Sequence, residues 1–204
     1  IYRGELQSRS LGIAVKFYND AGQEVINQKG ELVCTLPFPS MPLYFWNDPD
    51  GKIYHQAYFA KYHNIWAHGD YGKLTSHNGV VIYGRSDTVL NPAGIRIGTA
   101  EIYAEVEKIP EVIESLAVGQ SYQNDERVIL FVVLQLNIKL DDGLKNKIKQ
   151  QIKIGASPRH VPAVIIQVPE LPRTTSGKLV ELAVKNIIAG LEVKNKSALA
   201  NPEV

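Results

Sequence analysis

The sequence predicts an α+β protein in which a mostly-β segment, residues 1–86, is followed by a small α+β unit, residues 87–204. Two observations lead to this prediction. Short apolar segments separated by turn signals dominate the first part, as is typical of strands. After residue 98 the apolar residues recur at helical spacing, and helical and strand-like segments then follow one another. The second part is expected to contain a β-hairpin, a sheet and three helices.

Two strands are expected early in the first part, over residues 13–17 and 31–36. Apolar residues alternate with other residues in the first of these segments, and prolines end regular structure after the second. Residues 43–66 are rich in aromatic side chains. We interpret this stretch as a loop-rich packing layer, with a ligand site as the alternative.

Two hairpins are expected next. Strands over residues 71–75 and 80–84 flank Asn78-Gly79, a dipeptide that favours the positive φ angles of two-residue hairpin turns. The second hairpin turns at residues 91–94, where the order Asn-Pro-Ala-Gly is typical of a type I turn.

Three helices are expected in the second part. The first begins at Thr99 as its N-cap and ends at Pro110. The second is capped by Asp141 or Asp142, and the last spans residues 179–189.

Three further strands are expected, over residues 116–118, 128–134 and 164–168. The middle strand is apolar without alternation, so both of its faces should be buried.

Composition excludes several classes of protein. Twenty-two Lys and Arg residues balance twenty-one Asp and Glu residues, which argues against a nucleic-acid partner. The longest apolar run, residues 128–134, is far shorter than the roughly twenty residues of a membrane span. Cys34 is the single cysteine, which excludes an intrachain disulfide and fits a reducing cytoplasm. The chain opens with Ile1 and not Met, so we expect it to be part of a longer protein.

The first candidate site lies at the open end of the hairpin over residues 71–84. Antiparallel pairing brings residues 68–70 beside residues 84–87, about 5 Å apart. Asp70 and Arg85 then emerge side by side. The carboxylate could accept hydrogen bonds from both hydroxyls of a ribose, and the guanidinium could add donors. On spacing alone, an exposed ion pair is the favoured interpretation.

Two further segments carry anion-binding chemistry. Gly94 would permit close approach of a ligand, and Arg96 could neutralise a phosphate. Residues 171–178 offer hydroxyl donors, a glycine and Lys178, but not the spacing of a P-loop. Taken alone, each segment also has an interpretation without a ligand. The first would be a turn with a solvated arginine, and the second a helix cap with a solvated lysine.

The histidines lack the spacing of a helical zinc pair, and no metal site is expected. The sequence also lacks a nucleophile elbow and a dinucleotide-binding fingerprint, which are the usual anchors of hydrolases and dehydrogenases.

In their combination and order, these segments resemble the adenylate-forming acyl-CoA synthetase superfamily. The matching segments are residues 30–32, 68–70, 84–87, 91–102 and 172–178. Within the superfamily the chain looks most similar to the acetoacetate–CoA ligases. The narrower likeness lies in residues 37–42, in His68 where relatives usually have Thr, and in the tail residues 193–195 and 198–202. The resemblance covers essentially the whole chain.

Such enzymes join an acid to ATP, supplied with Mg²⁺, to give an acyl-adenylate and pyrophosphate, and then transfer the acyl group to coenzyme A. The resemblance implies that Asp70 holds the ribose hydroxyls and that Arg85 supports this contact. It implies that Asp87 is the hinge of a small mobile C-terminal domain. Lys178 would bridge the acid and the α-phosphate, and Arg96 would assist the departing phosphates.

The resemblance also implies that Gly94 lines the tunnel for the pantetheine of coenzyme A. Lys149 or Lys153, of which Lys153 is our choice, would meet the nucleotide end of coenzyme A. The alternative is a solvated lysine-rich helix face.

The phosphate loop and acyl pocket of the superfamily have no counterpart in this sequence. By resemblance, residues 1–86 are the C-terminal β part of the large domain, and residues 87–204 are the small domain. The chain is therefore expected to need the N-terminal part of such an enzyme as its partner and to be inactive alone. Two alternatives stay open: an acetyl- or propionyl-CoA synthetase of the same superfamily, and a non-catalytic nucleotide-binding module.

Overall fold

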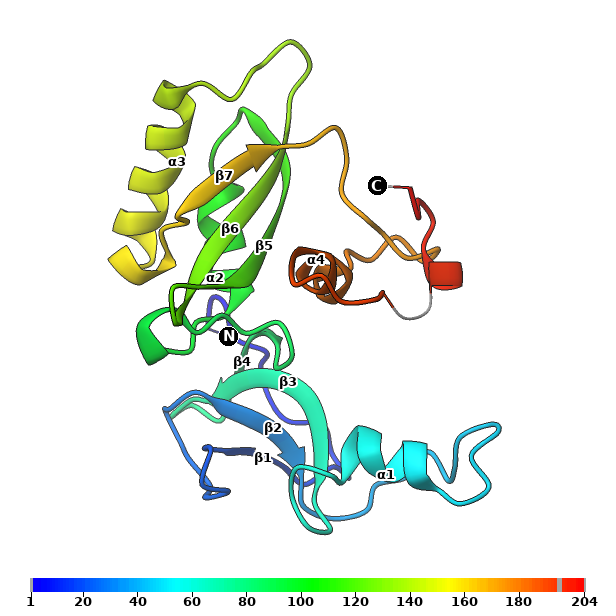
Figure 1. The fold of residues 1–204 in the computed structure, drawn as a ribbon. Helices are drawn as coiled ribbons and strands as arrows, with labels where there is room; N and C mark the ends of the chain where they lie inside the picture. The colour runs from blue at the N-terminus through cyan, green and yellow to red at the C-terminus, as the bar shows by residue number, and fades with distance from the viewer. Residues whose placement is uncertain (1, 194–195, 204) are drawn as a thin grey trace. The chain divides into compact units, whose positions relative to one another are not determined.

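The computed structural model describes residues 2–193 and 196–203. The chain divides into two compact units, Ile1–Ser86 and Asp87–Val204 (Figure 1). The first is built on a four-stranded sheet, and the second combines a three-stranded sheet with helices. The predicted α+β class is confirmed.

The sheet of the first unit is antiparallel throughout, with its strands in chain order. Its strands are β1 (Val15–Tyr18), β2 (Gly30–Cys34), β3 (Trp66–Leu74) and β4 (Val80–Arg85). The predicted hairpin is present: β3 and β4 pair across the turn in which Asn78 has a φ of 61°. A small apolar core under the sheet is centred on Phe17, Leu74 and Val80.

A short helix in the aromatic stretch was not expected from the sequence. Helix α1 (Lys52–Tyr58) begins where the carboxylate of Asp48 accepts hydrogen bonds from the backbone N–H groups of Ile53 (3.1 Å) and Tyr54 (2.8 Å). These contacts satisfy first-turn donors that would otherwise lack partners. The prediction of a loop-rich layer was therefore wrong at α1.

The aromatic residues of this stretch divide between core and surface. Tyr58 stacks on Trp66 with ring centroids 3.6 Å apart, and Trp66 is only 3% exposed. Trp46, in contrast, is 88% exposed. The prediction of a packing layer is right for the side chains that contact β3 and for Phe45, which packs against Tyr54 and Tyr58, and wrong for the exposed Tyr44 and Trp46.

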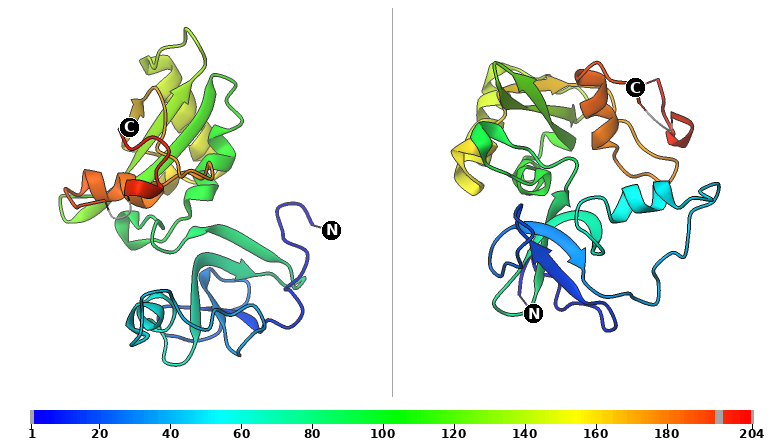
Figure 2. Two further views of the ribbon diagram at one scale, coloured as in Figure 1. Left: turned by 90° about the vertical axis from the view of Figure 1, so that its right-hand side faces the viewer. Right: turned by 60° about the horizontal axis from the view of Figure 1, so that its bottom comes forward.

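In the second unit, helices cover both faces of the sheet. Strand β5 (Val112–Tyr122) pairs antiparallel with β6 (Asp125–Leu134), and β7 (Val164–Gln167) pairs parallel with β6. Helices α2 (Thr99–Val106) and α3 (Asp142–Gly155) lie on one face and α4 (Glu181–Ile188) on the other, as Figures 1 and 2 show.

Strand β6 is buried on both faces, as its unbroken apolar sequence predicts. Leu130 and Val132 point into the core under α2 and α3, whereas Ile129 and Phe131 point into the core under α4. This strand therefore forms the centre of the second unit.

Two predicted details of the first helix were wrong. Gly98, and not Thr99, occupies the N-cap position, and its N–H donates to the Glu101 carboxylate at 3.0 Å. Thr99 is instead the first helical residue and is buried. The helix ends at Val106, before Pro110. For the second helix, Asp141 is the cap, because its carboxylate accepts a hydrogen bond from the N–H of Leu144 at 2.8 Å.

The turn at residues 91–94 also differs from the prediction. Pro92–Gly94 form a 3₁₀ turn in which Ala93 has a φ of 52°, outside the range of a type I turn. Leu90 still pairs with Ile97 across it, so the second hairpin is present as an isolated bridge. No helix in the described part of the chain is long and apolar enough to cross a membrane.

Tyr103 joins three elements of the second unit. Its hydroxyl accepts a hydrogen bond from the backbone N–H of Ala117 in β5 at 3.0 Å and donates to Glu181 at the start of α4. Burial and the neighbouring Glu181 carboxylate raise the pKa of Tyr103 well above its ordinary value. The hydroxyl therefore stays protonated and available as a donor.

We expect Tyr103→Phe to lower the free energy of unfolding by about 1–3 kcal/mol, because the N–H of Ala117 loses its acceptor. In the unchanged protein the raised pKa of Tyr103 contributes stability that is fully present below the unfolded pKa of about 10. The free energy of unfolding of the unchanged protein should therefore fall as the pH rises above that value, and Tyr103→Phe should lack this part of the fall. Urea denaturation between pH 7 and 11 measures both effects. Tyr122→Phe, at the exposed end of β5, is the matched control; equal stability of the two variants would contradict the role of Tyr103.

Candidate functional site

Asp70 and Arg85 lie side by side at the edge of the first sheet, as the hairpin register predicts. The two residues are direct cross-strand partners in β3 and β4. A guanidinium nitrogen of Arg85 lies 3.5 Å from a carboxylate oxygen of Asp70 and donates to the carbonyl of His68 at 3.2 Å. The Asp70 side chain keeps 25% of its surface exposed. A ligand hydroxyl can therefore still reach the carboxylate.

His68 brings a second nitrogen to Asp70. The indole N–H of Trp66 donates to Nδ1 of His68 at 3.1 Å, which leaves the proton of the neutral imidazole on Nε2. That Nε2 lies 3.5 Å from the Asp70 carboxylate. The carboxylate is thus flanked by His68 and Arg85, both on the β3–β4 hairpin.

Glu31 positions this edge, a role that the sequence analysis missed. Its carboxylate is 3% exposed and accepts hydrogen bonds from the N–H of Gly69 at 3.1 Å and from Nζ of Lys61 at 2.6 Å. Gly69 has a φ of +82°, and a Cβ there would collide with the Arg85 guanidinium. A carboxylate inside an otherwise apolar strand was the available signal, because such a group needs a partner when buried.

Gly94 and Arg96 lie on an exposed loop of the second unit, residues 91–96, which we call the Gly94 loop. Two carboxylates at the start of β6 hold it. Glu126 accepts from the N–H of Asn91 at 2.5 Å, and Asp125 accepts from the N–H of Ala93 at 2.9 Å. The turn held by these contacts is the one in which Ala93 has a φ of 52°. A Cβ at Gly94 would meet nothing within 4 Å, so open space adjoins the loop.

Lys178 lies at the end of a tight turn formed by residues 173–178, the lysine loop. The N–H of Thr174 donates to the carbonyl of Lys178 at 2.8 Å, and the N–H of Lys178 donates to the Thr174 hydroxyl at 3.1 Å. Arg173 ties the loop to the sheet through an ion pair with Glu114, 2.6 Å long. The side chain of Lys178 is exposed.

The Gly94 loop and the lysine loop are anchored at opposite ends of β5. The lysine loop contacts Glu114 near the start of the strand. The Gly94 loop contacts Asp125, the cross-strand partner of Tyr122 at the end of the strand. Eight residues of strand correspond to roughly 25 Å. The structure therefore does not bring Gly94 and Lys178 together.

Lys153 and Asp87 also lie far from the lysine loop along the chain. Lys153 is exposed in the last turn of α3, on the face of the sheet opposite to α4. Asp87 begins the second unit, and its carbonyl accepts a hydrogen bond from Nζ of Lys185 in α4 at 3.0 Å.

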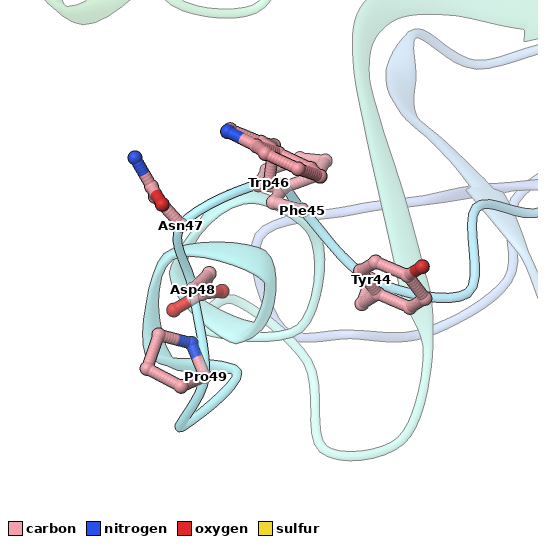
Figure 3. A pocket seen from close by; sticks show the side chains of 6 residues that line it. All are labelled: Tyr44, Phe45, Trp46, Asn47, Asp48 and Pro49. Atoms are coloured by element: carbon pink, nitrogen blue, oxygen red, sulfur yellow. The ribbon is translucent and has the colours of Figure 1, made fainter.

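A hollow of about 530 Å³ beside α1 is lined by Tyr44, Phe45, Trp46, Asn47, Asp48 and Pro49 (Figure 3). The only carboxylate in its lining, Asp48, already caps α1 through Ile53 and Tyr54. The hollow therefore lacks a free catalytic group, and we assign no chemistry to it.

Comparison with known proteins shows a family domain and several proteins to which the chain is similar. The family described as AMP-binding enzyme C-terminal domain matches residues 101–178. The acetoacetyl-coenzyme A synthetase of Rhizobium meliloti (strain 1021) is 57% identical over 100% of this chain, and that of Xenopus tropicalis is 47% identical over 100% of it. The solved structure of acetoacetyl-CoA synthetase from Streptomyces lividans matches 100% of this chain with a TM-score of 0.93 and 43% identity.

The chain spans about a third of the length of these relatives: 31%, 30% and 31% respectively. The narrower likeness seen in the tail includes residues 194 and 195, which lie outside the described residues. The similarity at 43–57% identity extends over the whole chain. The chain is therefore similar over its whole length to a C-terminal portion of the acetoacetyl-CoA synthetases, and its residues 101–178 match the AMP-binding enzyme C-terminal domain.

Proposed function

We propose that this chain supplies part of the nucleotide site and the small mobile domain of an ATP-dependent acid–CoA ligase that acts on acetoacetate. The protein that contains the chain, called the parent protein below, forms acetoacetyl-adenylate and then acetoacetyl-CoA. The observation that carries the proposal is 57% identity over the whole chain to an acetoacetyl-coenzyme A synthetase. The domain boundary near residue 87 and the residue roles below are part of the proposal.

Asp70 is proposed to accept hydrogen bonds from the ribose hydroxyls of ATP, which enters with Mg²⁺. Its position between His68 and Arg85 supports this role, because both side chains orient the carboxylate while part of it stays exposed. A carboxylate oxygen has lone pairs enough to accept from two neighbouring hydroxyls.

Lys178 and Arg96 are proposed to act in adenylation. A carboxylate oxygen of acetoacetate attacks the α-phosphorus of ATP, the bond from that phosphorus to the bridging oxygen breaks, and pyrophosphate leaves. Negative charge increases between the acid and the α-phosphate, where the ammonium of Lys178 stabilises it. Arg96 stabilises the departing pyrophosphate.

The Gly94 loop is proposed to serve the second step. The sulfur of coenzyme A attacks the acyl carbon of the adenylate, AMP leaves with the bonding electrons, and the thiol proton goes to solvent. The open space beside Gly94 supports a passage for the pantetheine arm. Lys153 is proposed to meet the nucleotide end of coenzyme A.

The anchoring of the two loops at opposite ends of β5 supports a change of pose between the steps. A rigid unit cannot present both ends of one strand to the same reacting group at once. We therefore propose that the second unit turns about Asp87 after adenylation. The reaction is proposed to occur in the cytoplasm.

Asp87→Pro should impair this turn, because the proline ring fixes φ at the hinge. We expect overall turnover to fall by about tenfold or more while each half-reaction, measured alone, changes less. Leu136→Pro is the control, since it occupies the second position of a surface turn in which Asn137 has a φ of 69°. Unchanged overall turnover in Asp87→Pro would place the hinge elsewhere.

Product analysis of the parent protein tests the proposed function. The parent protein is supplied with ATP, Mg²⁺, coenzyme A and acetoacetate, acetate or propionate, and the thioesters are quantified by mass spectrometry. We expect acetoacetyl-CoA to be the main product. Preference for acetate or propionate would overturn the proposed acid, and the absence of any thioester would overturn the ligase function.

A further inference from the structure

We infer that residues 198–201 position the lysine loop for adenylation and that Asn201 makes the central contact. This inference rests on the proposed function, in which Lys178 stabilises the adenylation transition state. Asn201 is a positioning residue, because it acts on the backbone of the loop and not on a substrate. In Figure 1 the segment (red) runs beside the lysine loop (orange).

The segment pairs with the loop in the manner of a short strand. Leu199 forms an antiparallel bridge with Thr174. The N–H of Thr175 donates to the carbonyl of Ala198 at 3.1 Å, and the N–H of Ala200 donates to the carbonyl of Arg173 at 2.8 Å. Backbone groups of Arg173 and Thr175 are thus paired with this segment.

Asn201 adds three hydrogen bonds from one side chain. Its Oδ1 accepts from the N–H of Arg173 at 2.8 Å. Its Nδ2 donates to the carbonyl of Leu171 at 3.1 Å and to the carboxylate of Glu170 at 3.1 Å. Both the oxygen and the nitrogen of the side-chain amide are therefore hydrogen-bonded to residues 170–173, which lead into the loop.

Arg173 is held from two sides as a result. Its side chain reaches Glu114 on β5 at 2.6 Å and the carbonyl of Gly177 within the loop at 2.5 Å. Its backbone N–H and carbonyl are bound by Asn201 and Ala200. The turn that presents Lys178 is thus fixed between β5 and the segment over residues 198–201.

This double attachment matters because Lys178 itself is exposed and carries a long flexible side chain. An ammonium stabilises a transition state best when it is already positioned, and a misplacement of about 1 Å can cost up to about 100-fold in rate. Loss of the segment's contacts would free the backbone under Lys178. It would not touch the Gly94 loop, which is anchored by Asp125 and Glu126.

The first test separates the two half-reactions in the parent protein. We expect Asn201→Ala to slow pyrophosphate release with ATP and acetoacetate by about tenfold. Thioester formation from supplied acetoacetyl-adenylate and coenzyme A should stay within about twofold. Asn201→Asp keeps an acceptor for Arg173 but loses the donors and adds a negative charge near Glu170. Its rate of pyrophosphate release should therefore lie between that of the unchanged protein and that of Asn201→Ala. Glu203→Ala, exposed two residues further on, is the matched control.

Equal losses in both half-reactions would overturn the inference, because a general loss of stability affects both steps. Unchanged adenylation in Asn201→Ala would overturn it as well. Lys178→Ala is measured alongside as a reference. If that variant keeps full adenylation, the proposed role of Lys178 fails, whatever Asn201 does.

Hydrogen–deuterium exchange tests the contacts without any assay of activity. In the parent protein, we expect Asn201→Ala to speed amide exchange in peptides that cover residues 171–178. Peptides from α3 should exchange as in the unchanged protein, since α3 lies on the other face of the sheet. Unchanged exchange at residues 171–178 would contradict the positioning role even if activity fell.

Discussion

Lys178→Ala is expected to lower the rate of adenylate formation in the parent protein by about 10²–10³-fold. The ammonium is proposed to stabilise charge that develops between acetoacetate and the α-phosphate, and alanine leaves that charge without a fixed partner. Thioester formation from supplied acetoacetyl-adenylate should change by less than about threefold, because the lysine loop and the Gly94 loop are anchored at opposite ends of β5. Rapid-quench measurement of each half-reaction gives both rates.

Two variants control this experiment. Lys139→Ala removes an exposed lysine far along the chain from the lysine loop and should leave both rates unchanged. Lys178→Arg keeps the positive charge but changes its shape and reach, so it should restore adenylation only in part. Equal loss of both half-reactions in Lys178→Ala would contradict the assigned role.

Gly94→Leu is expected to have the opposite profile. A leucine side chain would project into the open space beside the Gly94 loop, where the pantetheine arm is proposed to pass. We expect thioester formation to fall by about 100-fold, with adenylation changed by less than about threefold. The same pair of half-reaction assays measures both effects.

Backbone strain needs its own control here, because Gly94 has a φ of +74°. Gly190 has a similar φ of +70° and equally open surroundings. Gly190→Leu therefore introduces comparable strain at the end of α4. If Gly190→Leu slowed thioester formation as much as Gly94→Leu, strain and not blockage would explain the loss.

The features that could be predicted from the sequence depend on local signals. Asn78-Gly79 indicates a hairpin by itself. The register that places Asp70 beside Arg85 also depends on a turn longer than two residues and on a bulge between Tyr71 and Gly72. The unbroken apolar sequence of β6 indicates burial on both faces, as observed. Asp141 caps α3 through a residue three positions away.

Features that depend on distant partners could not be predicted in this way. Glu31 binds Gly69, which is 38 residues away, and Asn201 binds Arg173, which is 28 residues away. Ala93 takes its positive φ where Asp125 accepts its N–H, although its local sequence favours a type I turn. Helix α1 has seven residues and none is fully buried, so its apolar period, Tyr54 and Tyr58, is too short to detect.

The proposed roles of Arg96 and Lys178 depend on one claim, that the parent protein forms an enzyme-bound acyl-adenylate before coenzyme A reacts. Exchange of labelled pyrophosphate into ATP, measured without coenzyme A, tests this claim most directly. We predict exchange that requires acetoacetate and is lost in Lys178→Ala. Exchange that does not need the acid, or none until coenzyme A is added, would contradict it.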